Sequence, residues 1–363
     1  MRGGRHLDED DIRVRARGGS RPRTRTRPKH EDAELGFVTA VDRGRYRCLV
    51  ADRTVVAMKA RELGKGSIVV GDLVALVGDL SGTPDTLARV VRVEERDSIL
   101  RRTADDTDPV ERVIVANADQ LVIVVALADP EPQPRFIDRC LVAAYDAGLE
   151  PLLCLTKSDL AEPEPLVTAY SALGLDWVVT RKDEDVSGLR DRLLGRVSVM
   201  VGSSGVGKST LVNLLVPEAQ RAVGHVNAVT GRGRHTSTSA VALPIGAVAS
   251  TEGLARLRAA RGAEDGDSRL DYGWIIDTPG VRSFGLAHVN PDDVVAGFSD
   301  LSDAVSECPP GCTHLEGGNC ALDTWLGLGR IDPVRVASLR RLLTSREADP
   351  GADASPQRQP GGN

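Results

Sequence analysis

The sequence predicts an α/β protein with three folded parts: an N-terminal OB-fold β-barrel, a circularly permuted P-loop domain and a C-terminal helical zinc-binding domain. Three observations lead to this prediction. Five short β-type runs lie within residues 35–100, strands alternate with helices over 101–290, and three cysteines and a histidine cluster in residues 291–346. A length of 363 residues and a hydrophobic content of 41% suit two or three globular domains.

The two ends of the chain are expected to be disordered. Residues 1–34 hold eight Arg or Lys and no acid between Arg13 and Lys29, and residues 347–363 are rich in Gly, Pro, Gln and Asp. The basic tail is either a solvated segment or an arm that contacts nucleic-acid phosphates. The net charge of −6 indicates no partner by itself.

No apolar run reaches the roughly 18 residues of a membrane span, and no apolar segment follows the Arg-rich start of the chain. We therefore expect a cytoplasmic protein with no membrane partner. Cys48, Cys140 and Cys154 stand in apolar contexts and are predicted to be buried core thiols.

Residues 35–100 are expected to form the barrel. The β-type runs are 37–41, 46–50, 54–58, 73–77 and 87–93, with turn residues between them. Five strands in about 65 residues favour an OB-fold, with an SH3-like barrel as the alternative. Basic side chains that could contact RNA are Arg43, Arg45, Arg47 and Lys59.

Residues 101–290 are expected to form a doubly wound sheet with its ligand loops at the carboxyl ends of the strands. Strands are predicted at 121–127, 152–156, 177–180, 197–201 and 273–276, and helices at 136–147, 186–194 and from 209 to 215. The helix at 136–147 stops at Gly148, a residue type that commonly ends helices. Residues 251–271 are charged and rich in Gly and Ala, so we expect an exposed insertion.

A P-loop, G-x-x-x-x-G-K-S, follows the strand 197–201 and opens a helix. Its glycines let backbone N–H groups approach phosphate oxygens. We expect Lys208 to bridge the β- and γ-phosphates and Ser209 to bind Mg²⁺. The predicted nucleotide contacts here are Gly202, Ser203, Ser204, Gly205, Val206, Gly207, Lys208, Ser209 and Thr210.

A second phosphate element, Asp277-Thr278-Pro279-Gly280, follows the strand 273–276. Asp277 is expected to hold Mg²⁺ through water, and the Gly280 N–H to contact the γ-phosphate. Val281 occupies the position after Gly280, where Ras-type enzymes carry a water-orienting Gln, so another residue must orient the attacking water.

A guanine-recognition loop is predicted at Thr156-Lys157-Ser158-Asp159, directly after the strand 152–156. The Asp159 carboxylate can accept from guanine N1–H and N2–H₂ together, a pair that adenine lacks. Thr156 replaces the usual Asn, and its hydroxyl supplies only part of the hydrogen bonding of an amide. Thr180, at the end of the next strand, is expected to mark a second base-contacting loop.

This guanine loop precedes the other two motifs, whereas in an ordinary small GTPase it follows them. The order therefore predicts a circularly permuted GTPase with GTP or GDP and Mg²⁺ as its ligands. A P-loop ATPase or kinase conflicts with Asp159.

Residues 231–238 lie between the P-loop and Asp277, where a switch loop belongs. Either Thr236 or Thr238 is expected to close over Mg²⁺, and spacing does not choose between them. His235 is the candidate for positioning the attacking water, because an imidazole can accept a proton near pH 7.

A metal site is predicted in the C-terminal part, where the four ligand types lie within thirteen residues. The spacing is Cys308-x₃-Cys312-x-His314-x₅-Cys320. A Cys₃His set closes a tetrahedron, which indicates one structural Zn²⁺ rather than a catalytic one.

Together these motifs resemble the ribosome small subunit-dependent GTPase A family (RsgA/YjeQ) over residues 35–345. The stretches that carry the resemblance are Asn117-Ala118-Asp119-Gln120, Gly205–Ser209, Gly233–Thr236, Asp277–Arg282 and Cys312–His314. The chain departs from the family pattern at Thr156 and in the first zinc spacing, where four residues are expected instead of three.

The resemblance implies GTP hydrolysis stimulated by the 30S subunit and a role in late small-subunit maturation. It further implies that His235 is catalytic and that the barrel and zinc domain bind 16S rRNA. The alternative is a GTP-dependent rRNA-binding placement factor whose hydrolysis is incidental. We expect a monomer.

Overall fold

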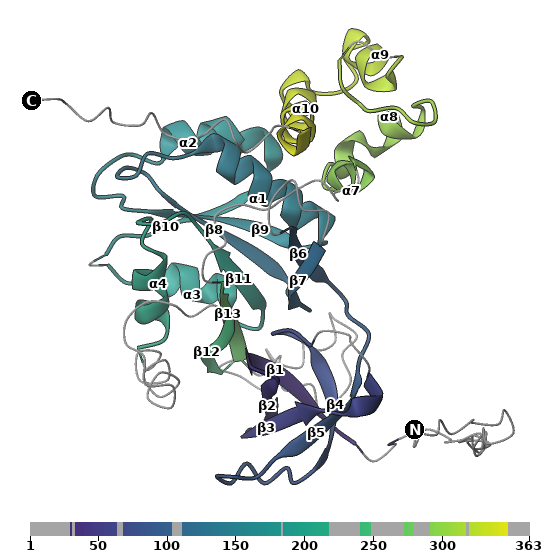
Figure 1. Cartoon of the computed structure of the whole chain (residues 1–363). Coiled ribbons are helices and arrows are strands. Elements are labelled where there is room, and N and C mark those ends of the chain that lie inside the picture. Colours follow the sequence, from purple (N-terminus) through teal and green to yellow (C-terminus); the bar gives the residue numbers. More distant parts are fainter. Residues whose placement is uncertain are drawn as a thin grey trace, which may run out of the picture. The chain divides into compact units, whose positions relative to one another are not determined.

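The computed structural model describes residues 30, 33–63, 68–103, 111–182, 184–217, 240–247, 272–278, 291–316 and 319–347 (Figure 1). Several predicted features lie outside the described residues. These are the basic tail up to residue 29, the loop 231–238, the insertion 251–271 and the C-terminal segment from 348.

Five strands form a closed barrel near the N-terminus. They are β1 (Glu34–Asp42), β2 (Arg45–Val50), β3 (Arg53–Lys59), β4 (Leu73–Gly78) and β5 (Ala88–Val93). The neighbours run β1-β2-β3-β5-β4, and β4 pairs with β1 to close the ring. The pairing of β3 with β5 is parallel and the other four pairings are antiparallel. The predicted OB-fold is confirmed, since this order and the parallel β3–β5 pair define it.

A second group of strands forms the sheet that carries the motifs. Its parallel members are β8 (Gln120–Ala126), β9 (Glu150–Thr156), β10 (Asp176–Val179), β11 (Val197–Val201) and β13 (Tyr272–Asp277). They lie in the order β10-β9-β8-β11-β13, and β12 (Val241–Ala247) joins antiparallel to β13. The strand predictions at 121–127, 152–156, 177–180, 197–201 and 273–276 are therefore confirmed to within two residues at each end.

Helices cover both faces of this sheet, as a doubly wound fold requires. They are α1 (Pro134–Asp146), α2 (Glu164–Tyr170), α3 (Ser187–Leu193) and α4 (Lys208–Leu215). Every residue of β8 is buried. Leu121 and Ile123 pack in the core that contains α1, and Val122 and Val124 pack in the core that contains α3 and α4. This alternation explains why the β8 sequence is uninterruptedly apolar.

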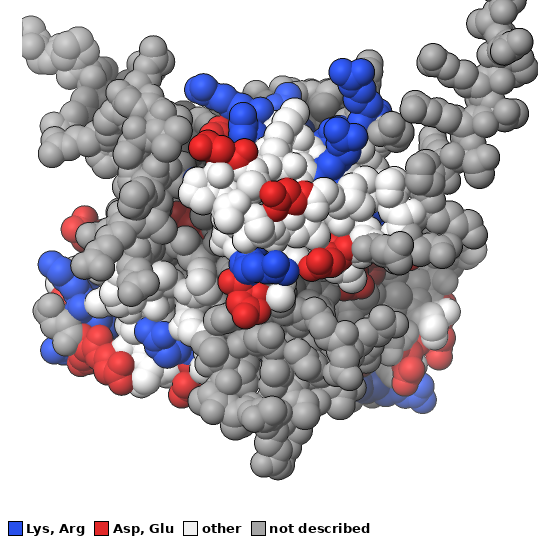
Figure 2. Space-filling view, turned by 90° about the horizontal axis from the view of Figure 1, so that it is seen from below, with Lys and Arg blue, Asp and Glu red and all other residues white. Residues whose placement is uncertain are grey.

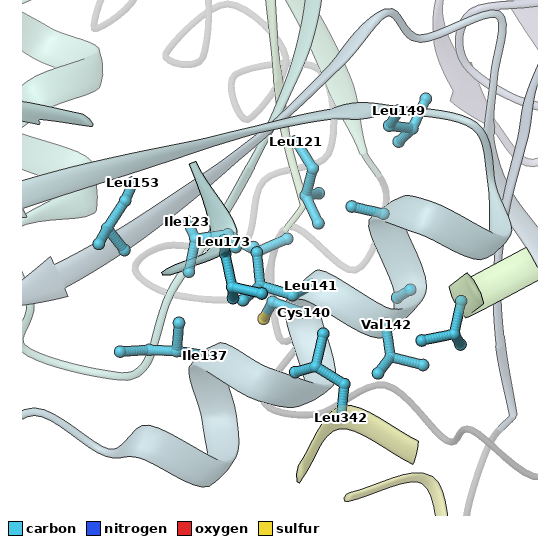
Figure 3. Packing of buried hydrophobic residues seen from close by; sticks show 14 of the residues in the cluster. Leu121, Ile123, Ile137, Cys140, Leu141, Val142, Leu149, Leu153, Leu173 and Leu342 are labelled. Atoms are coloured by element: carbon cyan, nitrogen blue, oxygen red, sulfur yellow. The ribbon is translucent and has the colours of Figure 1, made fainter. Parts of the chain in front are cut away.

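The helix α1 ends where the sequence predicts. Gly148 has a φ of +66°, a left-handed conformation that glycine adopts without strain. Along α1, Ile137, Leu141 and their neighbours are buried against the sheet on one side (Figure 3). Leu342 of the C-terminal helix α10 (Pro333–Glu347) belongs to the same core.

The C-terminal helices are attached to α1 and α2 through polar contacts as well. Besides α10 they are α7 (Pro291–Ala296), α8 (Ser302–Ser306) and α9 (Ala321–Gly327). The buried Asp138 of α1 accepts a hydrogen bond from the Tyr170 hydroxyl at 3.0 Å and lies 3.2 Å from Nε of Arg341. Burial raises the pKa of Asp138 while Arg341 and the Tyr170 hydrogen bond lower it, with the net effect upward.

In the parts of the chain described, no helix is long and apolar enough to span a bilayer.

Several elements were not expected from the sequence. The hairpin of β6 (Ile99–Thr103) and β7 (Glu111–Ala116) and the strand β12 are the main ones. Pro244 and Gly246 interrupt the pattern of β12, and both residue types normally argue against a strand interior. β12 tolerates them because it pairs with β13 with a register shift between Pro244 and Ala247.

Candidate functional site

The P-loop connects β11 to α4 as predicted. Gly205 and Gly207 have φ values of +84° and +94°, so a side chain at either position would strain the backbone. At Gly202 a Cβ atom would lie 2.8 Å from the Val124 carbonyl oxygen, which leaves no room for any other residue. The helix α4 begins at Lys208, so the loop runs directly into a helix N-terminus, where backbone N–H groups favour anions.

The side chains at the end of β13 lie against the P-loop. Nζ of Lys208 is 3.1 Å from Oδ1 of Asp277 and donates to the Thr278 carbonyl at 3.2 Å. The buried Thr278 hydroxyl donates to the Met200 carbonyl at 3.1 Å, which fixes the end of β13 to β11.

Asp277 has a carboxylate oxygen that lacks a hydrogen-bond donor among the described residues. Its Oδ1 atom is buried, and although Lys208 is within ion-pair distance, no described residue gives this oxygen a hydrogen bond of good geometry. A buried carboxylate oxygen without a hydrogen bond is costly unless a cation or an ordered water completes it. The residues here therefore fit a hydrated Mg²⁺ ion beside a phosphate.

The guanine-loop candidate lies next to the P-loop. The Thr156 hydroxyl, buried at the end of β9, donates to the carbonyl of Val206 at 2.6 Å. Lys157 has a φ of +58°, and its Nζ donates to the carbonyl of Asp129. Thr156 thus contacts the P-loop, a role that the sequence did not indicate, while Asp159 is exposed.

Thr180 and Ser209 are also placed at this edge of the sheet. The N–H of Thr180 donates to the Leu155 carbonyl at 2.7 Å, so the end of β10 adjoins the end of β9. Ser209 and Thr210, in the first turn of α4, are exposed. The other predicted residues lie outside the described part of the chain; they are His235, Thr236, Thr238 and Gly280.

Asp119 holds the opposite ends of the same strands. Its Oδ2 accepts from the N–H of Val197 at 2.7 Å, and its own N–H donates to the Val197 carbonyl at 2.8 Å. Its carbonyl accepts from the N–H of Glu150 at 2.9 Å. Asp119 therefore fixes the first residues of β11 and β9, whose last residues lead into the two nucleotide loops. The sequence feature that could have indicated this role is the position of an acid directly before a buried strand, β8.

The four predicted metal ligands come together in the C-terminal part. One ligand atom from each of Cys308, Cys312, His314 and Cys320 lies within 4.8 Å of every other. The Sγ atoms of Cys308 and Cys320 are 3.8 Å apart, and Sγ of Cys320 is 4.0 Å from Nδ1 of His314. Two sulfurs bound at about 2.3 Å to one tetrahedral ion would be about 3.8 Å apart.

The local chain shape helps to close this cluster. Gly311 and His314 both have positive φ values, +78° and +59°, which turn the chain tightly between the ligands. Burial raises the pKa of Cys320 to about 12, and burial also lowers the pKa of His314. Without a cation the buried thiol therefore stays protonated, whereas a bound metal ion stabilises the thiolate. The donor set fits a soft divalent metal ion.

These features define the class of protein. The sheet order, the P-loop, the acid after β13 and the loop after β9 form the nucleotide-binding arrangement of a P-loop GTPase, here with circularly permuted connections. An RsgA GTPase family model matches residues 93–259. A protein of Pseudomonas syringae pv. tomato, "Small ribosomal subunit biogenesis GTPase RsgA", is 36% identical over 292 residues, which are 78% of this chain and 76% of that protein. The chain belongs to the RsgA GTPase family.

Another relative carries the same name, and two solved structures have the same fold. A protein of the same name from Ectopseudomonas mendocina is 41% identical over 245 residues, which are 65% of this chain and 64% of that protein's length. Two solved structures share the fold, both with a TM-score of 0.59. YjeQ from Thermotoga maritima is 23% identical, covering 86% of this chain and 98% of its own. YloQ, described as a circularly permuted GTPase, is 21% identical, covering 88% and 98%.

The hydroxyl of Thr156 gives a test of the contact between the two loops. Thr156→Val keeps the shape of the side chain but leaves the Val206 carbonyl without its donor. We expect a loss of about 1–3 kcal/mol in the free energy of unfolding, measured by urea denaturation. Thr156→Ser retains the hydroxyl and is expected to stay close to the unsubstituted protein. Equal stability of the Val and Ser variants would show that the contact contributes nothing.

Proposed function

We propose that this protein is a GTPase that binds the 30S ribosomal subunit and hydrolyses GTP to GDP and phosphate during late small-subunit maturation, with the subunit stimulating hydrolysis. The observation that carries the proposal is the meeting of the P-loop, Asp277 and the Thr156–Asp159 loop at one edge of the sheet. The names of the relatives give the ribosomal partner.

The proposed contacts with the nucleotide follow from the chemistry of each side chain. Asp159 accepts from the guanine base, and the stem of Lys157 lies over it. Gly202 to Thr210 supply N–H groups and the Lys208 charge to the phosphates. Ser209 and Asp277, with Thr236 or Thr238, would hold Mg²⁺, and the N–H of Gly280 would contact the γ-phosphate. When bound, the ion would offset the negative charge of the phosphates.

Lys208 must leave its present partners to take part. It is paired with Asp277 and the Thr278 carbonyl, and a phosphate is a stronger acceptor for an ammonium than a carbonyl is. Its release would leave the Asp277 carboxylate free to help hold Mg²⁺. His235 is proposed to orient the attacking water, because Val281 cannot do so.

The three parts of the chain are proposed to divide the work. Residues 35–100 would bind RNA, 101–290 would bind and hydrolyse GTP, and 291–346 would form the zinc-binding part. On the barrel, Arg45 and Arg47 are exposed on β2. In the view from below, the described Lys and Arg side chains lie in several groups with Asp and Glu between them (Figure 2). On this face, the described basic side chains do not form one continuous patch (Figure 2).

One structural Zn²⁺ is proposed to be held by Cys308, Cys312, His314 and Cys320, since four protein ligands leave no open position for a substrate.

The protein is proposed to act as a monomer in the cytoplasm, where the small subunit matures.

The proposed activity is tested by GTP and ATP turnover with and without purified 30S subunits. We expect slow GTP hydrolysis alone, a rise of about 10-fold or more with subunits, and no ATP turnover. His235→Ala is expected to abolish the stimulated rate while nucleotide binding persists. Equal rates with and without subunits would contradict the proposed activator. Normal subunit maturation in cells carrying His235→Ala would favour the placement factor.

The metal site is tested by the zinc content of the purified protein. We expect about one zinc per chain and about none in Cys320→Ser, because loss of one thiolate opens the tetrahedron. Cys48→Ala is the matched control, since Cys48 is a buried barrel thiol far from the cluster in sequence. Full zinc content in Cys320→Ser would contradict the assignment.

A further inference from the structure

Arg340 reaches from the C-terminal helix α10 to the loop that carries the proposed metal ligands. Its Nε donates to the carbonyl of His314 at 3.1 Å, and its Nη2 donates to Oδ1 of Asp323 at 2.5 Å. Only 12% of the Arg340 side chain is exposed. The two partners belong to different segments of the chain, so one guanidinium joins these segments to each other and to α10.

Both partners of Arg340 belong to the immediate surroundings of the Cys₃His cluster. His314 is itself one of the four clustered residues, and its carbonyl is part of the backbone that carries the imidazole. Asp323 lies in the first turn of α9, and Cys320 is the N-cap residue of that helix. The N–H of Asp323 donates to the Cys320 carbonyl at 3.1 Å. Arg340 therefore fixes His314 and Cys320 relative to each other.

The backbone of His314 depends on this support. Its φ is +59°, a conformation that residues other than glycine adopt rarely and that persists only where the surroundings hold it. The His314 N–H donates to Sγ of Cys312 at 3.4 Å, and the side chain of His314 is buried. One backbone polar group of His314 is thus held by a sulfur of the cluster and the other by Arg340.

Helix α10 is a firm support for the Arg340 side chain. Its buried apolar side chains belong to the core that also contains α1 (Figure 3); they are Val336, Leu339, Leu342 and Leu343. The next residue, Arg341, has different partners: its Nε is 3.2 Å from Oδ2 of Asp138, and its guanidinium lies 4.9 Å from the centre of the Tyr170 ring. Two consecutive arginines thus contact the metal loop and the nucleotide-binding part respectively.

The charge of Arg340 also suits a metal-loaded cluster. Three thiolates and one divalent ion leave a net negative charge on a Cys₃His site. A guanidinium is permanently charged and can bind two acceptors at once. Because Arg340 is largely shielded from solvent, its attraction for the loaded cluster is weakly screened.

We propose that Arg340 is a positioning residue of the metal site, which holds His314 and the start of α9 in place and so determines how slowly the metal ion is lost. The proposal rests on the zinc site of the proposed function. Arg340 acts through the residues that bind the ion and does not bind it itself. Loss of a residue that orients metal ligands typically lowers metal affinity about 10- to 100-fold.

The test measures zinc release from the full-length, zinc-loaded protein into an excess of the chromogenic chelator 4-(2-pyridylazo)resorcinol. Arg340→Met keeps an unbranched side chain but loses the charge and both hydrogen bonds. We expect zinc to leave this variant at least about 10-fold faster. Arg340→Lys keeps the charge without the fork that binds two acceptors, so its rate is expected to lie between the two. An unchanged rate in Arg340→Met would overturn the proposal.

Arg341→Met is the matched control. It removes the same charge from the next residue of α10 and leaves the buried Asp138 without its ion pair. We expect this variant to unfold at a lower urea concentration but to release zinc at the rate of the unsubstituted protein. Equal acceleration in Arg341→Met and Arg340→Met would overturn the proposal, because metal retention would then follow general stability.

Asp323→Asn decides the question if Arg340→Met does not fold. This milder variant keeps an acceptor oxygen and removes the negative charge that Arg340 contacts. We expect zinc release that is faster than in the unsubstituted protein. Release at the unsubstituted rate would contradict the proposed role of the Arg340–Asp323 contact.

Cobalt binding separates a positioning role from the loss of a ligand. The visible absorption bands of bound Co²⁺ depend on its ligand set and geometry. In Arg340→Met we expect unchanged band positions at saturation, with about 10-fold or more cobalt needed for half-saturation. Shifted bands would mean that a ligand is lost and would overturn the positioning role. A protein that takes up neither zinc nor cobalt would overturn the proposed metal site itself, whereas equal metal retention without Arg340 overturns this inference alone.

Discussion

The nucleotide site depends on the parallel pairing of β11 with β8 on one side and with β13 on the other. Parallel strands end at the same edge of a sheet, so the strand ends at Val201, Thr156 and Asp277 bring the P-loop, the Thr156–Asp159 loop and the Asp277 carboxylate to one place. The order of these strands along the chain has no effect on that edge. A permuted chain can therefore keep the nucleotide-binding geometry while placing a barrel before it and a helical part with the Cys₃His cluster after it.

The same strands are also held at their other ends, at the first residues of β11 and β9. Asp119 both accepts from and donates to the backbone of Val197, the first residue of β11, and its carbonyl accepts from the N–H of Glu150, the first residue of β9. At the far end the Thr156 hydroxyl ties the guanine loop to the Val206 carbonyl of the P-loop. This hydrogen bond restrains the movement of the Thr156–Asp159 loop relative to the P-loop. Preorganisation of this kind lowers the ordering cost of binding a nucleotide.

Much of the fold could be predicted because local signals agree with the tertiary structure. The unbroken apolar run of β8 reflects burial on both faces, and the glycines of the P-loop reflect positive φ values and close backbone approach. The partner of the Thr156 hydroxyl could not be predicted, because Val206 is fifty residues away. The β1–β12 pairing joins residues about two hundred positions apart. β12 was not predicted because Pro244 and Gly246 are uncommon inside strands. The strand is maintained by its pairing with β13 and β1.

Competition binding tests most directly whether these loops form a site for a guanine nucleotide. A fluorescent GDP bound to the protein is displaced by GTP or by ATP, first in the unsubstituted protein and then in Asp159→Asn. We expect displacement by GTP at concentrations at least about 100-fold lower than by ATP, and a much smaller preference in the variant, since the amide replaces one of the two acceptor oxygens with an NH₂ donor that faces the donors of guanine. Equal displacement by ATP, or an unchanged preference in Asp159→Asn, would contradict it.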